Sequence, residues 1–295
     1  MSEVVSDKVV LENEELKITI NKAGAELVSI VRKQDDTEYM WSGDSKYWGR
    51  VSPVLFPFVG KLNNQSYTHK GETYSGIPQH GFARDSVFTV SELTDDTVWM
   101  ELEKGDIWAQ KYPYDFNLRL GYRLEGCSVH VMWNVINTGA EQLHFQIGAH
   151  PAFVCDGGLD GYALDFHNNC SSKGCGVLNS EGVLSDEKRS VDFDNGVLAL
   201  SDELFDKDAL IFDGVGINTI SIINPDGKAY LQLRFDAPQL GIWSPVGKKA
   251  PFVCIEPWYG RSDRAGYQGE LADREYSNTL EAGHSFNKEY VIDIL

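Results

Sequence analysis

Apolar and polar residues alternate along much of this chain, and a period of two is the pattern of β-strands with one buried face. Residues 16–20 and 27–31 alternate in this way on either side of a turn at 22–25. In the clearest run, residues 116–124, one face would carry Phe116, Leu118, Leu120, Tyr122 and Leu124. These segments predict short antiparallel strands.

Turn signals separate further candidate strands. Asn-Pro-Asp-Gly at 224–227 predicts a hairpin between its flanking strands. The other strands that we predict are 129–137 and 143–147, joined by a Thr-Gly turn, then 219–223, 230–235 and a final strand at 288–295. Helical periodicity is scarce, and its candidates are 44–48, 201–205 and 271–274. We therefore predict an all-β fold of two large packed antiparallel sheets, forming a single domain over residues 1–295.

Composition excludes several classes of partner. The 295 residues carry a formal charge of −18, which argues against nucleic acid and against an anionic membrane surface. The five cysteines lack the spacing of a metal site, and free thiols are typical of a reducing compartment. The sequence shows neither an apolar signal segment nor an apolar run of membrane-spanning length. We therefore predict a cytoplasmic protein without a bound metal.

His150 and Glu256 are the strongest candidates for acid–base chemistry. His150 ends a predicted strand in a Gly-Ala-His-Pro-Ala-Phe segment, where Pro151 restricts the backbone. Histidine titrates near neutral pH, which suits proton transfer. Five of the six residues before Glu256 are apolar, and burial raises the pKa of a carboxyl group toward that of a useful base. The alternatives are a structural histidine bound to a backbone carbonyl, and a salt bridge from Glu256 to Arg261 or Arg264.

Other residues are candidates for ligand binding. His80 lies in a Pro-Gln-His-Gly loop, and loops often carry function, although a buried loop histidine can also be structural. Asp208 precedes an apolar segment and could either bind a sugar hydroxyl or end a turn. Trp258 and other aromatic residues offer flat apolar faces to a sugar ring, or they pack in the core. His144 would share a strand face with His150, but a third metal ligand at a suitable spacing is missing.

Taken in order, several segments resemble the aldose 1-epimerase (galactose mutarotase) family. They are Gly-Ala-Glu-Leu-Val-Ser-Ile at 24–30, the Trp-Gly-Arg to Val-Gly-Lys block at 48–61, Gln-His-Gly-Phe-Ala-Arg-Asp at 79–85, Tyr-Pro-Tyr-Asp-Phe at 112–116, Gly-Ala-His-Pro-Ala-Phe at 148–153 and Ile-Glu-Pro-Trp-Tyr-Gly at 255–260. The likeness runs from about residue 8 to the end, and the ordered set is more specific than any one motif. It is greatest to a bacterial branch encoded near lactose and tagatose operons.

The resemblance implies a galactose mutarotase-like β-supersandwich that works without a cofactor. It also implies roles by position. Glu256 matches the general base of the family, and His150 matches its general acid. His80 matches the second histidine that binds the sugar, and Asp208 matches the aspartate that binds a hydroxyl. The resemblance therefore implies an isomerase of carbohydrate metabolism that interconverts the anomers of an aldose.

The sequence departs from the family pattern at one place. The family has an arginine after the Val-Gly turn, whereas here Lys61 is the cation that follows it, so either Lys61 or Arg50 takes that place. Because the charge is −18 and the cations are scattered along the chain, we expect a neutral aldohexose. A hexose 6-phosphate would need two or more cations, for which Arg50, Lys61 and Arg84 are candidates.

Two further classes of function remain open. A non-catalytic carbohydrate-binding protein would have aromatic platforms without a working acid–base pair. A glycoside hydrolase would need two carboxylates across the scissile bond, and Glu256 is the one strong candidate. The sequence is also compatible with a homodimer.

Overall fold

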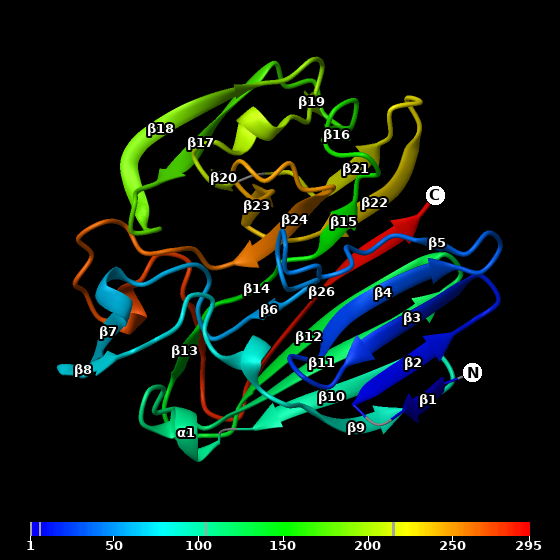
Figure 1. Ribbon diagram of the computed structural model, residues 1–295. Helices are drawn as coiled ribbons and strands as arrows, with labels where there is room; N and C mark the ends of the chain where they lie inside the picture. The colour runs from blue at the N-terminus through cyan, green and yellow to red at the C-terminus, as the bar shows by residue number, and fades with distance from the viewer. Residues whose placement is uncertain (1, 6, 104, 214–215) are drawn as a thin grey trace.

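The computed structural model describes residues 2–5, 7–103, 105–213 and 216–295, and it is built almost entirely of antiparallel strands (Figure 1). The largest sheet has the strand order β19-β16-β21-β22-β26-β12-β11-β10-β9. Its strands are β9 (Thr89–Leu93), β10 (Thr97–Glu103), β11 (Phe116–Glu125), β12 (Ser128–Asn137), β16 (Ala163–Asp165), β19 (Val197–Ala199), β21 (Thr219–Ile223), β22 (Ala229–Phe235) and β26 (Ser285–Ile294). The predicted all-β fold is confirmed.

The second large sheet has the order β18-β17-β20-β23-β24-β14-β6, with β15 also paired to β24. Its strands are β6 (Val54–Leu55), β14 (Ile147–Ala149), β15 (Ala152–Val154), β17 (Ser172–Leu178), β18 (Leu184–Asp192), β20 (Leu210–Asp213), β23 (Gln239–Trp243) and β24 (Phe252–Tyr259). In Figure 1, β17 and β18 lie at the top of the view, and β9 and β10 lie near the bottom.

The remaining elements are small. A five-stranded sheet contains β1 (Ser2–Val5), β2 (Lys8–Glu12), β3 (Leu16–Asn21), β4 (Glu26–Arg32) and β5 (Thr37–Glu38). Two strand pairs are β7 (Ser66–His69) with β8 (Glu72–Ser75), and β13 (Leu143–Phe145) with β25 (Asn278–Leu280). The helical segments are α1 (Asp106–Ala109) and the 3-10 turns η1 (Asn63–Gln65), η2 (Ala83–Asp85), η3 (Asp202–Phe205) and η4 (Leu271–Asp273). No helix in the described ranges is long and apolar enough to cross a membrane.

Most sequence expectations for the elements are confirmed. The apolar residues of 116–124 lie buried on one face of β11, and the Asn-Pro-Asp-Gly turn joins β21 to its partner β22. The final strand β26 begins earlier than predicted and lies inside the nine-stranded sheet, between β22 and β12. Of the helical candidates, 44–48 is a hydrogen-bonded turn, and the other two are the 3-10 turns η3 and η4.

The prediction of one continuous strand over 143–147 is wrong. The chain changes sheets at Gln146, because β13 pairs with β25 whereas β14 pairs with β24 and β6. The Gln146 backbone N–H donates instead to Pro57 O at 2.8 Å. As a result, His144 does not share a strand face with His150. Its Nδ1 lies 3.0 Å from Thr279 Oγ1, so this histidine is tied to β25.

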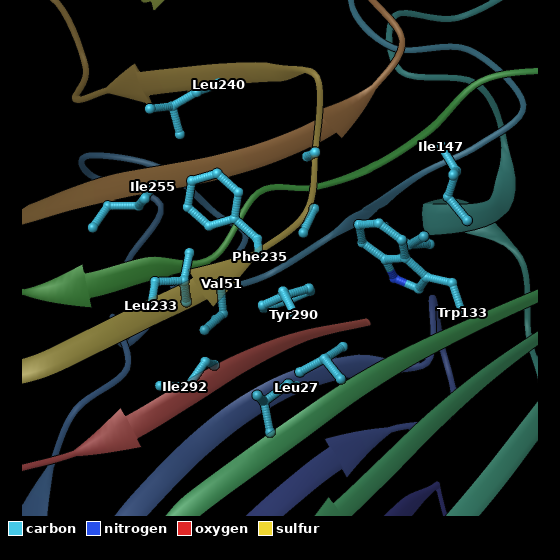
Figure 2. Close-up of a cluster of buried hydrophobic side chains, with 14 of the residues drawn as sticks. Leu27, Val51, Trp133, Ile147, Leu233, Phe235, Leu240, Ile255, Tyr290 and Ile292 are labelled. Atoms are coloured by element: carbon cyan, nitrogen blue, oxygen red, sulfur yellow. The ribbon is translucent and has the colours of Figure 1, made fainter. Parts of the chain in front are cut away.

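The core lies between the sheets and fixes the position of β24. Figure 2 shows Ile255 of β24 and Leu240 of β23 packed near Leu233 and Phe235 of β22 and Tyr290 of β26. Because side chains alternate along a strand, the residues on either side of Ile255 face away from this core. Both faces of β24 are buried, so one face carries apolar core residues while the other presents Cys254, Glu256 and Trp258.

Candidate active site

A cavity of about 400 Å³ lies over the second face of β24. Its walls come from β20, β23 and β24, from the end of β14, and from loops around residues 48–61, 79–84 and 178–182. The structure brings all eight predicted site residues to this cavity, namely Arg50, Lys61, His80, Arg84, His150, Asp208, Glu256 and Trp258. Their catalytic and binding roles remain predictions, but the residues do share one site.

Glu256 is buried, and within the described ranges its carboxylate pairs with no lysine or arginine. Its side chain is 1% exposed, and neither of the arginines named as alternative partners binds it. Arg261 binds Asp213 at 2.7 Å and also contacts Glu275, while Arg264 binds Glu275 at 3.0 Å. The carboxylate of Glu256 therefore belongs to the cavity and not to a structural salt bridge with these arginines.

Burial raises the pKa of Glu256 well above its usual value, and the negative charge of Asp208 raises it further. The Trp258 indole N–H acts in the opposite direction and lowers the pKa of Glu256, because it favours the ionised carboxylate. Asp208 itself is exposed and has a left-handed backbone with φ of 69°. Its Oδ1 accepts the Ala209 backbone N–H at 2.8 Å, which holds the carboxylate at the mouth of the cavity.

His150 faces Glu256 across the cavity wall. Its Nε2 lies 3.3 Å from Glu256 Oε2. The imidazole is stacked on Trp48 with a centroid distance of 4.7 Å, and Trp243 meets it edge-on at 5.4 Å. Burial, reinforced by the positive charge of Arg84, lowers the pKa of His150 to about 3. Its surroundings therefore favour neutral imidazole, just as those of Glu256 favour neutral carboxyl.

His80 is held in a fixed orientation by the backbone of a neighbouring loop. The Gly60 N–H donates to His80 Nδ1 at 3.0 Å, so the neutral ring carries its proton on Nε2. The backbone of His80 is left-handed with φ of 64°, and the next residue, Gly81, has φ of 70°. A Cβ atom on Gly81 would lie 2.2 Å from Phe56 O, so this turn requires glycine. Burial lowers the pKa of His80 well below its usual value, and nearby cations lower it further.

Three cations gather at the His80 end of the cavity. Arg50 Nη2 binds Asp85 Oδ1 at 2.7 Å, and Arg84 Nε lies 3.8 Å from the other oxygen of the same carboxylate. The pKa of Arg84 is lowered to about 10, first by burial and then by the charge of Arg50. Lys61 has no anionic partner among the described residues. The cations that appear scattered in sequence therefore lie together.

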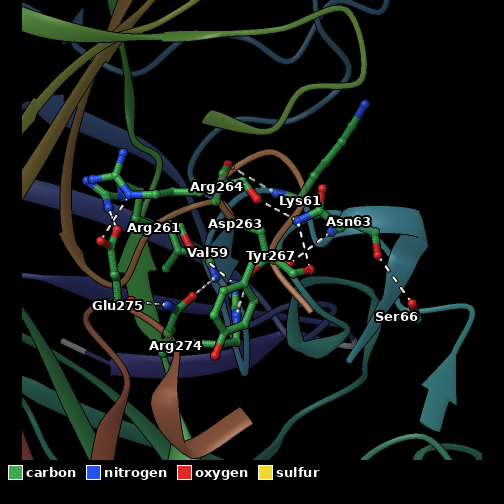
Figure 3. Close-up of polar contacts among 12 residues, drawn as sticks. Val59, Lys61, Asn63, Ser66, Arg261, Asp263, Arg264, Tyr267, Arg274 and Glu275 are labelled. Atoms are coloured by element: carbon green, nitrogen blue, oxygen red, sulfur yellow. Dashed lines mark hydrogen bonds and ion pairs between the residues drawn. The ribbon is translucent and has the colours of Figure 1, made fainter. Parts of the chain in front are cut away.

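A buried polar network anchors the loop that carries Lys61. The Lys61 N–H donates to Ser262 Oγ at 3.2 Å, and the Asp263 N–H donates to Lys61 O at 2.9 Å. The Asp263 carboxylate accepts the Asn63 N–H at 2.9 Å and binds Arg274 Nε at 2.7 Å. Figure 3 shows this network, with the Lys61 side chain extending away from it. The backbone of the loop is thus fixed while its ammonium group stays available.

Within the described part of the chain, one set of three side chains offers ligand atoms close enough together to bind a metal ion. Potential ligand atoms of His150, Cys254 and Glu256 lie within 4.8 Å of one another. Burial raises the pKa of the Cys254 thiol well above its usual value, so a metal bound there would first have to displace the thiol proton. The donor set therefore fits a proton-transfer pair better than a metal centre.

Sequence reasoning missed some of the cavity lining. Trp48 and Trp243 carry no local signal beyond being aromatic, yet their rings pack against the His150 ring. Gln79, Gly182 and Ser262 also line the cavity, and they are not among the predicted site residues. Gln79 directly precedes His80, which was a usable signal. The other two lie in loops whose meeting depends on the tertiary fold.

Comparison with known proteins shows the family of this chain. The family model for aldose 1-epimerase matches residues 7–293. The chromosomal LacX protein of Lactococcus lactis subsp. lactis is 30% identical over 97% of this chain and 98% of its own length. A galactose mutarotase related enzyme from Lactobacillus acidophilus shares 33% identity at a TM-score of 0.91, covering 98% of this chain and 97% of its own. A galactose mutarotase-like protein from Lactobacillus casei shares 31% identity at the same TM-score, covering 98% of this chain and all of its own. The chain therefore belongs to the aldose 1-epimerase family.

Proposed function

We propose that this protein exchanges the α and β anomers of an aldohexose. The observation that carries the proposal is the 3.3 Å contact between His150 Nε2 and Glu256 Oε2 at a cavity of about 400 Å³. A cavity of this size is in the range of small-molecule sites. The His–carboxylate pair supplies the two proton carriers that anomer exchange requires.

In the proposed reaction, Glu256 removes the proton from the C1 hydroxyl while His150 delivers a proton to the ring oxygen. The C1–O5 bond breaks, and the open-chain aldehyde rotates about the C1–C2 bond. The reverse transfers then close the ring in either configuration and return both protons. His80 and Asp208, which both line the cavity, hold sugar hydroxyls.

The protonation states follow from the shared contact. Opposing pKa shifts favour the neutral pair, with the proton on Glu256 and a neutral His150. The reactive pair, carboxylate and imidazolium, holds the same number of protons. One proton transfer along the 3.3 Å contact therefore converts the first pair into the second without exchange with solvent.

Polarimetry of freshly dissolved α-glucose and α-galactose tests this function. Glu256→Gln keeps the shape but cannot accept the proton, so exchange should fall by about 10²–10⁴-fold. Calorimetric titration with the same sugar should still detect binding to this variant. Wild-type exchange rates in Glu256→Gln on every active sugar would refute the assignment. A wild type that binds sugar but exchanges none would instead be a carbohydrate-binding protein.

A hexose 6-phosphate is the second candidate substrate, and the gathering of Arg50, Lys61 and Arg84 at one cavity favours it. Lys61 is the most informative of the three, because no carboxylate neutralises it within the described structure. If the phosphate binds there, Lys61→Met should raise the KM for glucose 6-phosphate and leave that for glucose unchanged. Equal KM values for glucose 6-phosphate in the two proteins would remove this candidate.

A further inference from the structure

The indole of Trp258 lies flat over two glycines on the neighbouring strands. Gly148 of β14 is the register partner of Trp258, and Gly241 of β23 is the register partner of Glu256. A Cβ atom on Gly148 would lie 2.6 Å from Trp258 Cδ1, and one on Gly241 would lie 2.5 Å from Trp258 Cζ2. Real Cβ atoms do not approach other atoms so closely, so the ring occupies space that only glycine leaves free on both strands.

These contacts fix the direction of the indole N–H. The indole lies with Cδ1 over Gly148 and Cζ2 over Gly241. Nε1 lies on the ring edge between these two atoms. Because Gly241 stands opposite Glu256, this edge leans along β24 toward the carboxylate. Trp258 Nε1 and Glu256 Oε2 are both buried, and neither has a hydrogen-bond partner of regular geometry within the described ranges. A buried donor thus lies beside a buried acceptor, both unsatisfied.

We propose that Trp258 is a positioning residue, whose indole N–H binds the ionised Glu256 carboxylate. The space that Gly148 and Gly241 leave free of a Cβ atom directs the indole N–H toward that carboxylate. The inference rests on the proposed function, in which Glu256 is the base. A neutral carboxyl gains less from such a donor than a carboxylate does, because hydrogen bonds to charged groups are the stronger kind. The bond therefore favours the reactive protonation state of the pair.

Trp258 acts on the Glu256 carboxylate alongside His150, which is the imidazolium of the reactive pair. His150 faces the carboxylate at 3.3 Å, Asp208 approaches from the segment before β20, and Cys254 lies two residues away on the same strand face. Asp208 disfavours the ionised carboxylate, and the Cys254 thiol carries no positive charge. The cations Arg50, Lys61 and Arg84 gather instead at the His80 end of the cavity.

The carboxyl titration of Glu256 tests the proposal directly. It can be followed by NMR of carboxyl-labelled glutamate, with the resonance assigned by its loss in Glu256→Gln. A hydrogen bond to a charged group is worth about 1.5–3 kcal/mol, so Trp258→Phe should raise the midpoint by about one to two pH units. Replacing Trp258 by its benzothiophene isostere removes only the N–H and should give the same shift in a ring of nearly equal volume. This isostere keeps the test valid if the phenylalanine variant folds poorly.

Glycine substitutions supply an independent arm. Gly241→Ala should displace the indole and raise the same midpoint, since the new Cβ would meet ring atoms of Trp258. Gly174→Ala in β17 is the matched control, because a Cβ there meets nothing within 4 Å, and it should leave the midpoint unchanged. In the activity assay, the alkaline limb of kcat/KM should move to higher pH in Trp258→Phe.

If Trp258 only packs, Trp258→Phe would lower the melting temperature without moving either the Glu256 titration midpoint or the alkaline limb of kcat/KM. An unchanged midpoint in the benzothiophene variant would overturn the proposal. A wild type without anomer exchange would refute the proposed function, whereas the NMR titration would still decide the role of Trp258.

Discussion

Glu256→Gln should stabilise the fold, and the gain should grow with pH. Burial raises the pKa of Glu256 in the folded protein, while the unfolded chain keeps a value near 4.5. Between these two values the folded state holds a proton that the unfolded state has released. The contribution of Glu256 to stability is therefore fully present below the unfolded pKa and is lost as the pH rises through the folded pKa. Glutamine does not titrate, so it avoids this loss.

The size of the effect follows from a single proton. One proton changes the free energy of unfolding by at most about 1.4 kcal/mol per pH unit. An unfolding entropy of about 2.1 cal/mol/K per residue gives roughly 600 cal/mol/K for this chain of 295 residues. The difference in melting temperature between Glu256→Gln and wild type should therefore grow by up to about 2 °C per pH unit above pH 4.5.

Scanning calorimetry between pH 5 and 8 measures this difference. His150 has a lowered pKa, so its own contribution is lost as the pH falls from 6.5, but the residue is present in both proteins and its effect largely cancels. The exposed Glu14→Gln is the matched control and should show no such trend. A difference that stays flat or shrinks as the pH rises would refute the claim that burial destabilises the ionised carboxylate.

Two other perturbations separate stability from binding. Arg274→Ala would leave Asp263 as an unpaired buried charge. Breaking such a pair costs about 3–5 kcal/mol, so the melting temperature should fall by several degrees. An unchanged melting temperature would show that the pair contributes nothing to stability. His80→Asn should raise the KM of the active sugar by about 5–100-fold, because one hydrogen bond to the sugar is lost. Gln79→Ala, a substitution of the neighbouring residue, should raise this KM less. A fall in kcat at constant KM would place His80 in the chemistry and not in binding.

The strands and the central site residues could be predicted because they follow local rules. The period of two places Phe116 and its alternate neighbours on a buried face, and the apolar run before Glu256 indicates a buried carboxylate. Family resemblance added the order of the motifs and the pairing of Glu256 with His150. The two residues are more than a hundred positions apart, and no local pattern states that they lie 3.3 Å from each other.

The features that could not be predicted depend on contacts between distant segments. The sheet change at Gln146 requires a partner carbonyl from Pro57 and a second sheet beside the strand end. The gaps at Gly148 and Gly241 have meaning only once Trp258 lies across both strands. A glycine within a strand looks like a weak position in sequence, whereas here it makes room for a large ring.

The structure divides the cavity into a rigid part and an adaptable part. Glu256 and Trp258 are fixed by β24, whose other face packs Ile255 into the core, so moving the carboxylate would disturb the packing of both large sheets. Lys61, Arg50 and Arg84 lie outside the strands of the large sheets, where a substitution changes charge without breaking a ladder of strand hydrogen bonds. In the proposed reaction, proton transfer would therefore depend on the fold itself, while the choice of sugar would depend on residues that can change independently. The fold therefore supports the proposed acid–base pair, whereas the sugar has to be identified by measuring turnover.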